Sequence, residues 1–231
     1  MTKNAVIVGA GKGLSAAFAR RLFSDGYKIA LAARDIEKLS TVVSDTNAIC
    51  KTCDCSNPHS IAGLFEWLDN ELGDLSVVLF NAGGRLRGGI EELDPEKVKK
   101  EILTTGYGGF MVAQAAAKRM LRLGRGAIFF TGASASVKGY PKSSPFAISK
   151  FGLRGLAQSL ARELSPKNIH VAHFVIDGGI SIGAHDPRSE KLQNDTLLDP
   201  SAIAETYFHV LSQHRSAWTW EVELRPWCEN F

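Results

Sequence analysis

A group of glycines near the beginning of the sequence could bind a phosphate. An apolar run that begins at Ala5 leads directly into the sequence Gly9-Ala10-Gly11-Lys12-Gly13-Leu14-Ser15. A segment of helical period follows, and at such a junction backbone N–H groups and the helix dipole meet an anion. Glycines alone are weak support, because any tight strand-to-helix turn needs residues of unrestricted φ. Their position between a strand and a helix favours a site for the pyrophosphate of a dinucleotide.

Two basic side chains predict which dinucleotide binds. The second apolar run ends at Ala33 and is followed by Arg34, at the place where an acidic residue would accept hydrogen bonds from an adenosine ribose. Lys12 in the glycine turn supplies a second cation. Because a guanidinium matches the geometry of a phosphate with paired donors, we predict NADP(H) in preference to NAD(H). The alternative, that Lys12 and Arg34 are solvated surface charges, stays open.

The composition excludes several classes of protein. With 231 residues, of which 45% are apolar and 22% charged, the sequence is typical of a soluble globular domain, and we expect one domain over residues 1–231. A net charge of +3 is too small to indicate a nucleic-acid partner. No apolar run approaches the ~20 residues of a membrane helix, and none resembles a signal peptide. We therefore expect a cytoplasmic protein whose partner is a small molecule.

The cysteines do not predict a metal site. Three of the four lie close together, at Cys50, Cys53 and Cys55, and the fourth is the distant Cys228. A zinc site needs about four ligands, and no histidine stands at finger spacing from this cluster. Free cysteines are commonly small core residues, so we expect buried thiols and no metal.

The elements that must position these residues alternate along the chain. Short β-branched runs alternate with longer segments of helical period, which is typical of βαβ units in an α/β fold. Several strands are almost continuously apolar, which indicates helices on both faces of a Rossmann-type, doubly wound, seven-stranded parallel sheet. The irregular segment 178–200 is a candidate substrate lid, or else a mobile insertion. The predicted strands are 5–9, 28–33, 48–53, 76–80, 127–132, 170–176 and 218–224, and the predicted helices are 15–24, 35–44, 58–72, 95–123, 144–164 and 201–211.

Three motifs together resemble those of the short-chain dehydrogenase/reductase family, over essentially the whole chain. The T-G-x-x-x-G-x-G of that family corresponds to residues 8–15, its Asp after the third strand to Asp54, and its N-A-G to residues 81–83. Ser15 replaces the last glycine of the first motif, which is expected to shift the helix slightly without closing the site. The resemblance implies that the cofactor is bound by Gly9, Gly11, Lys12, Gly13, Leu14, Arg34, Asp54, Cys55, Asn81, Ala82, Gly83, Lys150, Gly178 and Ile180.

The catalytic half departs from the family pattern. The family uses a Tyr-x-x-x-Lys pair, and here Phe146 stands at the tyrosine position and Lys150 at the lysine position. Counting back from Phe146 places Ala133 at the position of the family's serine, with Ser134 one residue later. Two further family positions, an asparagine and a proline, are occupied by Thr105 and Asp177.

These departures change the chemistry that the resemblance implies. In the family the lysine anchors the nicotinamide ribose and lowers the pKa of the tyrosine, so that the phenol can donate a proton. Phe146 has no proton to donate. A positioned general acid is worth about 10²–10⁴ in rate, whereas orientation of the reactants can supply roughly 7–11 kcal/mol. We therefore expect hydride transfer to persist, with Lys150 and Ser134 as candidate catalytic residues; Tyr140 and Tyr107 are alternative acids, although surface roles are favoured for both.

Two functions fit this pattern. The favoured one is an NADP(H)-dependent oxidoreductase with an atypical active site, acting on a carbonyl or conjugated enone compound. The alternative is a non-catalytic protein that binds NADP(H) as a sensor or scaffold, because three of the family's four catalytic positions are changed. Residues 109–117 are apolar nearly all round, and related helices of the family often pair across a two-fold axis. The resemblance therefore implies a homodimer or homotetramer.

Overall fold

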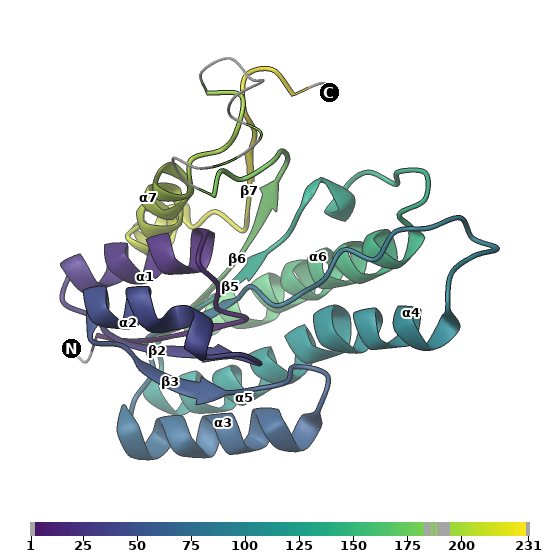
Figure 1. The fold of residues 1–231 in the computed structure, drawn as a ribbon. Coiled ribbons are helices and arrows are strands. Elements are labelled where there is room, and N and C mark those ends of the chain that lie inside the picture. The colour runs from purple at the N-terminus through teal and green to yellow at the C-terminus, as the bar shows by residue number, and fades with distance from the viewer. Residues whose placement is uncertain (1–2, 183–185, 187, 189–194, 230–231) are drawn as a thin grey trace.

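Seven parallel strands form one sheet in the computed structural model, which describes residues 3–182, 186, 188 and 195–229 (Figure 1). The order across the sheet is β3-β2-β1-β4-β5-β6-β7. The predicted α/β fold with a doubly wound parallel sheet is therefore confirmed. In chain order the strands are β1 (Asn4–Val8), β2 (Lys28–Ala33), β3 (Ile49–Thr52), β4 (Val77–Phe80), β5 (Gly126–Thr131), β6 (Ile169–Ile176) and β7 (Glu221–Leu224).

Helices cover both faces of the sheet, as the apolar strands require. Strand β1 is buried along its whole length, and its alternate side chains enter two separate cores. Ala5 and Ile7 pack in the core under α1 and α7, whereas Val6 and Val8 pack in the core under α3, α5 and α6. One face carries α1 (Leu14–Ser24), α2 (Ser40–Thr46) and α7 (Pro200–Leu211), and the other carries α3 (Pro58–Glu71), α4 (Pro95–Ile102), α5 (Gly108–Leu123) and α6 (Ser144–Leu164) (Figure 1).

Three helices begin where the sequence supplies both a cap and a proline. Asn57, Asp94 and Asp199 stand immediately before α3, α4 and α7, and each side chain accepts a hydrogen bond from a backbone N–H of the first turn. A proline follows in each case, at a helical position where its missing N–H costs nothing. Local sequence therefore fixes where these three helices start.

The structure divides the predicted helix 95–123 into two. Between α4 and α5 lies a π-helical turn, Leu103–Tyr107. Gly108 follows this turn and packs so closely on the loop after β3 that an added Cβ would lie 2.6 Å from the carbonyl oxygen of Cys55. The extra residue of a π turn shifts the helix register, and such turns are frequent at functional sites. Here the turn falls on Thr105, at the family's asparagine position.

Two other predicted elements are shorter than expected. The segment 35–44 begins as a 3₁₀ turn, Glu37–Leu39, and only then continues as α2; Asp35 lies before the turn and pairs with Lys38 at 2.7 Å. The last strand begins at Glu221 rather than at residue 218. Trp218 instead stacks on His170, with ring centroids 4.6 Å apart.

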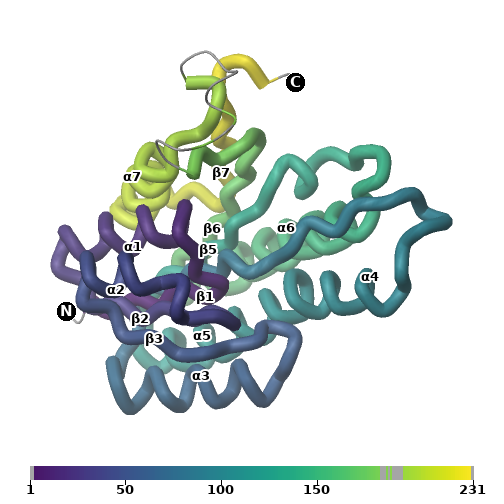
Figure 2. The backbone as a smooth tube through the Cα atoms, in the orientation of Figure 1, coloured from purple at the N-terminus to yellow at the C-terminus, as the bar shows by residue number. Residues whose placement is uncertain are grey.

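Two connections run side by side beyond the carboxyl ends of the central strands (Figure 2). One joins β4 to α4 and the other joins β5 to α6. The backbone N–H of Gly88 in the first donates to the carbonyl oxygen of Lys142 in the second, at 3.1 Å. The two connections therefore form one wall of the region in which the predicted site residues lie.

Candidate functional site

The strand order reverses between β1 and β4, which is where ligands bind in open parallel sheets. The glycine turn leaves the sheet after β1 and residues 81–83 leave it after β4. Asn81 joins the two: its amide nitrogen donates to the carbonyl oxygen of Gly9 at 3.2 Å and to the hydroxyl of Ser15 at 2.9 Å. Ser15 is buried and takes part in this contact, so the serine that replaces the family glycine ties the turn to β4.

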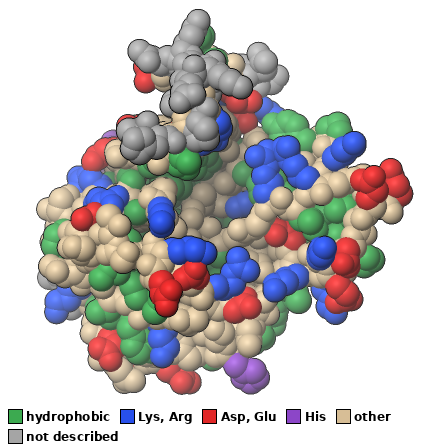
Figure 3. All heavy atoms as spheres, viewed as in Figure 1, with side chains coloured by type: hydrophobic (Ala, Val, Ile, Leu, Met, Phe, Trp, Pro, Cys, Tyr) green, Lys and Arg blue, Asp and Glu red, His purple; other side chains and the backbone are tan. Residues whose placement is uncertain are grey.

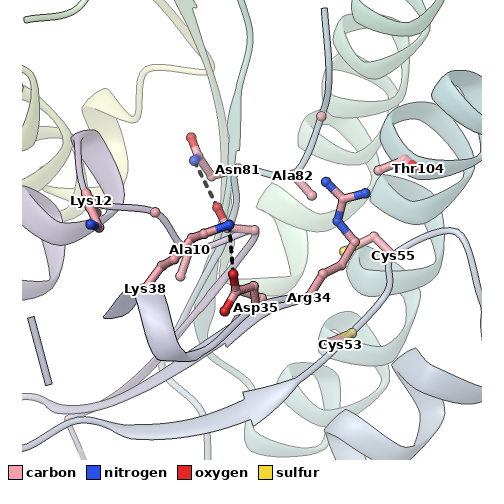
Figure 4. A pocket seen from close by; sticks show the side chains of 14 residues that line it. Ala10, Lys12, Arg34, Asp35, Lys38, Cys53, Cys55, Asn81, Ala82 and Thr104 are labelled. Atoms are coloured by element: carbon pink, nitrogen blue, oxygen red, sulfur yellow. Dashed lines mark hydrogen bonds and ion pairs between the residues drawn. The ribbon is translucent and has the colours of Figure 1, made fainter. Parts of the chain in front are cut away.

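A first cavity of about 320 Å³ opens over the glycine turn (Figure 4). Its walls come from the ends of β1, β2, β3 and β4 and from the π turn. It brings together Gly9, Gly11, Lys12, Arg34, Cys55, Asn81, Ala82 and Gly83 of the predicted cofactor residues, and adds Ala10, Ala33, Asp35, Lys38, Cys53 and Thr104.

The geometry of the turn fits a phosphate group. Gly9 has a φ of +83°, and an added Cβ would lie 2.3 to 2.7 Å from atoms of Ala82, so only glycine fits. Gly11 and Gly13 face open space, with no atom within 4 Å of an added Cβ. No side chain caps α1 and its first turn holds no acidic residue, so its N–H groups keep their capacity for an anion.

Three basic side chains surround this cavity rather than two. Arg34 extends toward Thr104, while Lys12 lies on the opposite side of the cavity (Figure 4). Lys38 lies nearer to Arg34 and forms an ion pair with Asp35, which lowers the pKa of that carboxyl. Lys38 was not among the predicted cofactor residues, although its spacing of four residues from Arg34 was a usable signal.

Six predicted cofactor residues do not line the first cavity, and three of them, Gly13, Leu14 and Asp54, lie close to it in the chain. Gly13 precedes α1, and Leu14 is buried against the core. The Asp54 carboxylate accepts hydrogen bonds from the backbone and hydroxyl of Ser56, at 2.9 and 2.7 Å, and these bonds lower the pKa of Asp54. Asp54 thus shapes the loop behind the cavity wall.

A second, larger cavity of about 730 Å³ continues from the first and shares Asn81 and Gly83 with it. Its walls come from the ends of β4, β5 and β6 and from the first turns of α6. Of the predicted residues it contains Asn81, Gly83, Ser134, Lys150, Gly178 and Ile180, together with Gly84, Arg85, Arg87, Thr131, Gly132, Ala133, Tyr140, Pro141, Phe146, Ile176, Asp177, Gly179 and Glu229.

Lys150 is the buried cation of the second cavity. Its side chain is only 6% exposed, and its Nζ donates to the carbonyl oxygen of Thr131 at 2.8 Å. Burial lowers the pKa of Lys150 to about 8, against an opposing effect of Glu101. Nζ also lies 5.9 Å from the ring centroid of Phe146. A lysine with this pKa is largely protonated at neutral pH and can release a proton more readily than an ordinary lysine.

The loop after β5 turns one serine toward the cavity wall and another away from it. Ala133 and Ser134 line the cavity, whereas Ser136 is completely buried with its Oγ 3.3 Å from Nε2 of His173. Nδ1 of His173 contacts Glu221 at 3.1 Å. Burial lowers the pKa of His173 to about 4, so the imidazole is neutral at ordinary pH. This buried chain supports the loop from behind.

A buried carboxylate holds the opposite wall. Glu101 accepts hydrogen bonds from the backbone N–H of Gly84 at 2.9 Å and from the hydroxyl of Thr105 at 3.2 Å. Thr105 is completely buried, so it replaces the family's asparagine with a side chain committed to Glu101. Of the alternative acids, Tyr140 lines the second cavity, whereas Tyr107 lines neither cavity and stacks on Phe110.

The comparisons with known proteins agree with this geometry. The model of the family described as short chain dehydrogenase matches residues 3–189. A solved short-chain dehydrogenase from Rhodopseudomonas palustris is 32% identical, with a TM-score of 0.84 over 98% of this chain and 100% of that one. The chain belongs to the short-chain dehydrogenase family.

Further short-chain dehydrogenases and reductases resemble the chain less closely in sequence. The 3-oxoacyl-[acyl-carrier-protein] reductase MabA of Mycobacterium tuberculosis is 28% identical over 197 residues, which are 85% of this chain and 77% of that protein. A metagenomic short-chain oxidoreductase solved in complex with NADP is 27% identical, covers 97% of each chain and has a TM-score of 0.83. The chain is therefore an oxidoreductase by family.

In this short-chain dehydrogenase, Asp177 fills the place of the family's proline with a buried charge. Its carboxylate pairs with Lys138 at 2.9 Å and with Arg225 at 3.2 Å, which joins the β5–α6 connection to the segment after β7. Gly178 follows with a φ of +152° and packs against Pro226. Within the predicted lid 178–200, residues 183–185, 187 and 189–194 lie outside the described part of the chain.

The part of the chain that the structure describes holds neither a membrane-spanning helix nor a cluster of metal ligands. None of its helices is long and apolar enough to span a bilayer. Within the same residues, no three His, Cys, Asp or Glu side chains come together as metal ligands. Cys53 and Cys55 are buried in the wall of the first cavity, and both are free thiols.

Proposed function

We propose that this short-chain dehydrogenase is an NADP(H)-dependent oxidoreductase that acts on a carbonyl or conjugated enone compound without a tyrosine proton donor. The observation that carries the proposal is the pair of joined cavities. The first combines an uncapped helix N-terminus with three basic side chains, and the second contains the buried Lys150. The NADP in the metagenomic relative and the reductase name of the mycobacterial relative support the same assignment.

The first cavity supplies the groups that NADP(H) needs. The N–H groups of the glycine turn and of the first turn of α1 bind the pyrophosphate. Arg34, with Lys38 beside it and Lys12 across the cavity, provides the cations for the 2′-phosphate. These cations bind a charged phosphate more strongly than the neutral ribose hydroxyl that NAD(H) has at the same position. When bound, the nicotinamide supplies or accepts the hydride.

Side chains of the second cavity stabilise the negative charge that hydride transfer creates on the substrate. Nζ of Lys150, fixed by the carbonyl oxygen of Thr131, donates to the oxygen of the substrate as negative charge develops there. The hydroxyl of Ser134 provides a second donor from the cavity wall. One such donor is worth roughly 10²–10³ in rate. A conjugated enone needs less help, because hydride addition at carbon leaves an enolate that Lys150 stabilises electrostatically.

A steady-state assay of NADPH consumption tests this proposal. A panel of matched ketones, aldehydes and enones is offered to the wild-type chain, and we expect turnover with at least one of them. The double variant Ala133→Ser with Phe146→Tyr, which restores the family's acid, is expected to gain rate on simple ketones. The proposal is contradicted if the wild-type chain does not oxidise NADPH above the rate without substrate, whether or not the double variant does.

The second candidate function is a cofactor-binding protein without catalysis. Phe146 favours it, because the ring has no proton to donate at the position of the family's tyrosine. A sensor of this kind binds NADPH but shows no turnover, and restoring Tyr and Ser gives it activity for the first time. Turnover by the wild-type chain therefore separates the two candidates.

We also infer that the protein is a homodimer or homotetramer through the face formed by α5 and α6. Phe110, Ile148 and Phe151 on these helices are 43%, 54% and 43% exposed, which is high for large apolar side chains. Pairing of two copies would remove this surface from water. Light scattering at micromolar concentration is expected to give at least twice the mass of the chain, and a 25.0 kDa species would contradict the inference.

A further inference from the structure

Among the residues that the structure describes, two arginines of the second cavity have no acidic partner. Arg85 and Arg87 lie on the connection between β4 and α4, are exposed, and line the cavity wall. No carboxylate in the described residues forms an ion pair with either of them. Other arginines of this chain, such as Arg119 and Arg154, hold a carboxylate through their guanidinium groups. Arg85 and Arg87 therefore keep all their donors for another molecule.

The backbone around these arginines is held in place. On one side, the N–H of Gly84 donates to the buried carboxylate of Glu101 at 2.9 Å. On the other side, the N–H of Gly88 donates to the carbonyl oxygen of Lys142 at 3.1 Å. The two guanidinium groups are thus presented from a segment that is fixed at both ends, which lowers the entropy cost of binding a ligand.

Arg85 and the buried Lys150 both lie near the aromatic ring of Phe146. Its guanidinium carbon lies 5.8 Å from the ring centroid of Phe146, and Nζ of Lys150 lies 5.9 Å from the same centroid. Phe146 offers these cations only the face of a ring, which is a weaker partner than an anion. The place where the family has a phenol therefore combines two positive charges with an apolar surface.

The charges that line the second cavity do not balance. Asp177 is already paired with Lys138 and Arg225, so it offers no net negative charge to a ligand. Glu229 is the other acidic residue among the described residues that line the cavity. Arg85, Arg87 and Lys150 set three positive charges against Glu229 in the lining and Glu101 behind the wall, which leaves a net positive charge. Figure 3 shows Lys and Arg side chains gathered beside the central hollow of the molecule.

We propose that the substrate of this enzyme is an anionic carbonyl compound, whose carboxylate or phosphate is bound by Arg85 and Arg87 while its reacting oxygen faces Lys150. The inference rests on the proposed function, because it takes the second cavity as the substrate pocket. Planar guanidinium groups bind carboxylate and phosphate oxygens through paired hydrogen bonds, and they do so more strongly than they bind neutral groups.

Calorimetric titration with three small probes tests this inference on the full chain, with and without saturating NADP⁺. Benzoate and phenyl phosphate carry the two candidate anions, and benzamide is a neutral molecule of nearly the same shape as benzoate. We expect one of the anions to bind at least about tenfold more tightly than benzamide, with a preference that weakens as salt is added. The more tightly bound anion identifies the group that the substrate carries.

Variants assign the preference to the two arginines. Arg85→Gln with Arg87→Gln is expected to abolish the preference for anions and to leave the affinity for NADPH unchanged. Arg125→Gln, which removes an exposed arginine before β5 at the opposite end of the sheet, is the matched control and keeps the preference. The inference is overturned if neither anion binds more tightly than benzamide, or if the double variant keeps the preference. Failure of NADP⁺ to bind would instead count against the proposed function, and the titrations without NADP⁺ report on the arginines in either case.

Discussion

The two joined cavities differ in the kind of group that lines them. After their proposed functions, we call the first cavity the cofactor half and the second cavity the substrate half. The cofactor half consists mainly of backbone groups, from the glycine turn, the uncapped N-terminus of α1 and the residues that follow β4. It tolerates Ser15 in place of a family glycine, because the serine packs inward and bonds to Asn81. The substrate half depends on single side-chain atoms, and the loss of one oxygen at Phe146 removes a proton donor. Backbone sites therefore survive sequence change that side-chain sites do not.

The same difference appears in how each half is supported. Gly9 is fixed by the close approach of Ala82, a contact that any side chain would disrupt. The substrate half is supported by buried polar groups instead, such as the Ser136–His173–Glu221 chain and the carboxylate of Glu101. We expect mutations in the first half to act through shape and mutations in the second half to act through charge.

The largest effect is expected from removal of the buried lysine. Lys150→Met is predicted to lower kcat/KM by about 10²–10⁴, because it removes the group proposed as the proton donor of the substrate half. With a pKa of about 8, Lys150 loses its proton above that pH, so wild-type kcat/KM should be level below pH 8 and fall about tenfold per pH unit above it. Lys118→Met, at an exposed site on α5, is the control. A pH profile that stays level through pH 10 would assign the proton to another group.

The next effect compares two glycines with nearly the same φ. Gly9 and Gly26 have φ values of +83° and +82°, but an added Cβ meets Ala82 at Gly9 and nothing within 4 Å at Gly26. Either change to alanine costs about 1–2 kcal/mol in backbone strain, and Gly9→Ala should cost roughly 1–3 kcal/mol more. Urea denaturation measures both free energies of unfolding. Equal losses would show that the fit of Gly9 against Ala82 is unimportant.

The buried histidine of the substrate half should make stability depend on acid pH. The pKa of His173 is about 4 in the folded chain and about 6.5 when unfolded, so the unfolded state binds the proton first as pH falls. The free energy of unfolding should therefore decrease by about 3 kcal/mol between pH 6.5 and pH 4. In His173→Gln the part of the loss that comes from His173 should disappear, leaving the smaller part from His170, whose pKa burial also lowers; a variant of the exposed His59 should keep the full loss. Parallel pH profiles of wild type and His173→Gln would contradict the assignment.

The smallest effect concerns the choice between the two coenzymes. Arg34→Ala should weaken NADPH binding about tenfold and leave NADH binding unchanged, because only NADPH carries the 2′-phosphate that the guanidinium is proposed to bind. Arg125→Ala serves as the control for a general loss of positive charge. If Arg34→Ala weakens both coenzymes equally, the guanidinium does not distinguish between them.

Much of the cofactor half could be predicted from the sequence, because its residues are contiguous. Residues 9–15 form one turn between a strand and a helix, and Arg34 ends the next strand. Lys38 was missed because the segment after β2 was expected to be a helix from residue 35 onward, with no specific direction for its side chains. The π turn at Leu103–Tyr107 was not predicted either, because it depends on how closely Gly108 packs on another loop.

The substrate half could be predicted only where a family position marked it. Phe146, Ala133 and Thr105 were found by their spacing from Lys150 and from one another. The supporting contacts of Glu101 and His173 join residues that are far apart in the chain, and periodicity carries no signal for them. Asp177 was predicted only as the loss of a proline, and its ion pairs with Lys138 and Arg225 became visible in the fold.

Calorimetric titration of the wild-type chain with NADPH and with NADH tests the central claim most directly. That claim is that the glycine turn and its neighbouring cations form a site for a phosphorylated dinucleotide. We predict saturable binding of NADPH at a single site per chain, with NADH at least about tenfold weaker because it lacks the phosphate that we propose Arg34 to bind. Absence of heat with both coenzymes would contradict the account.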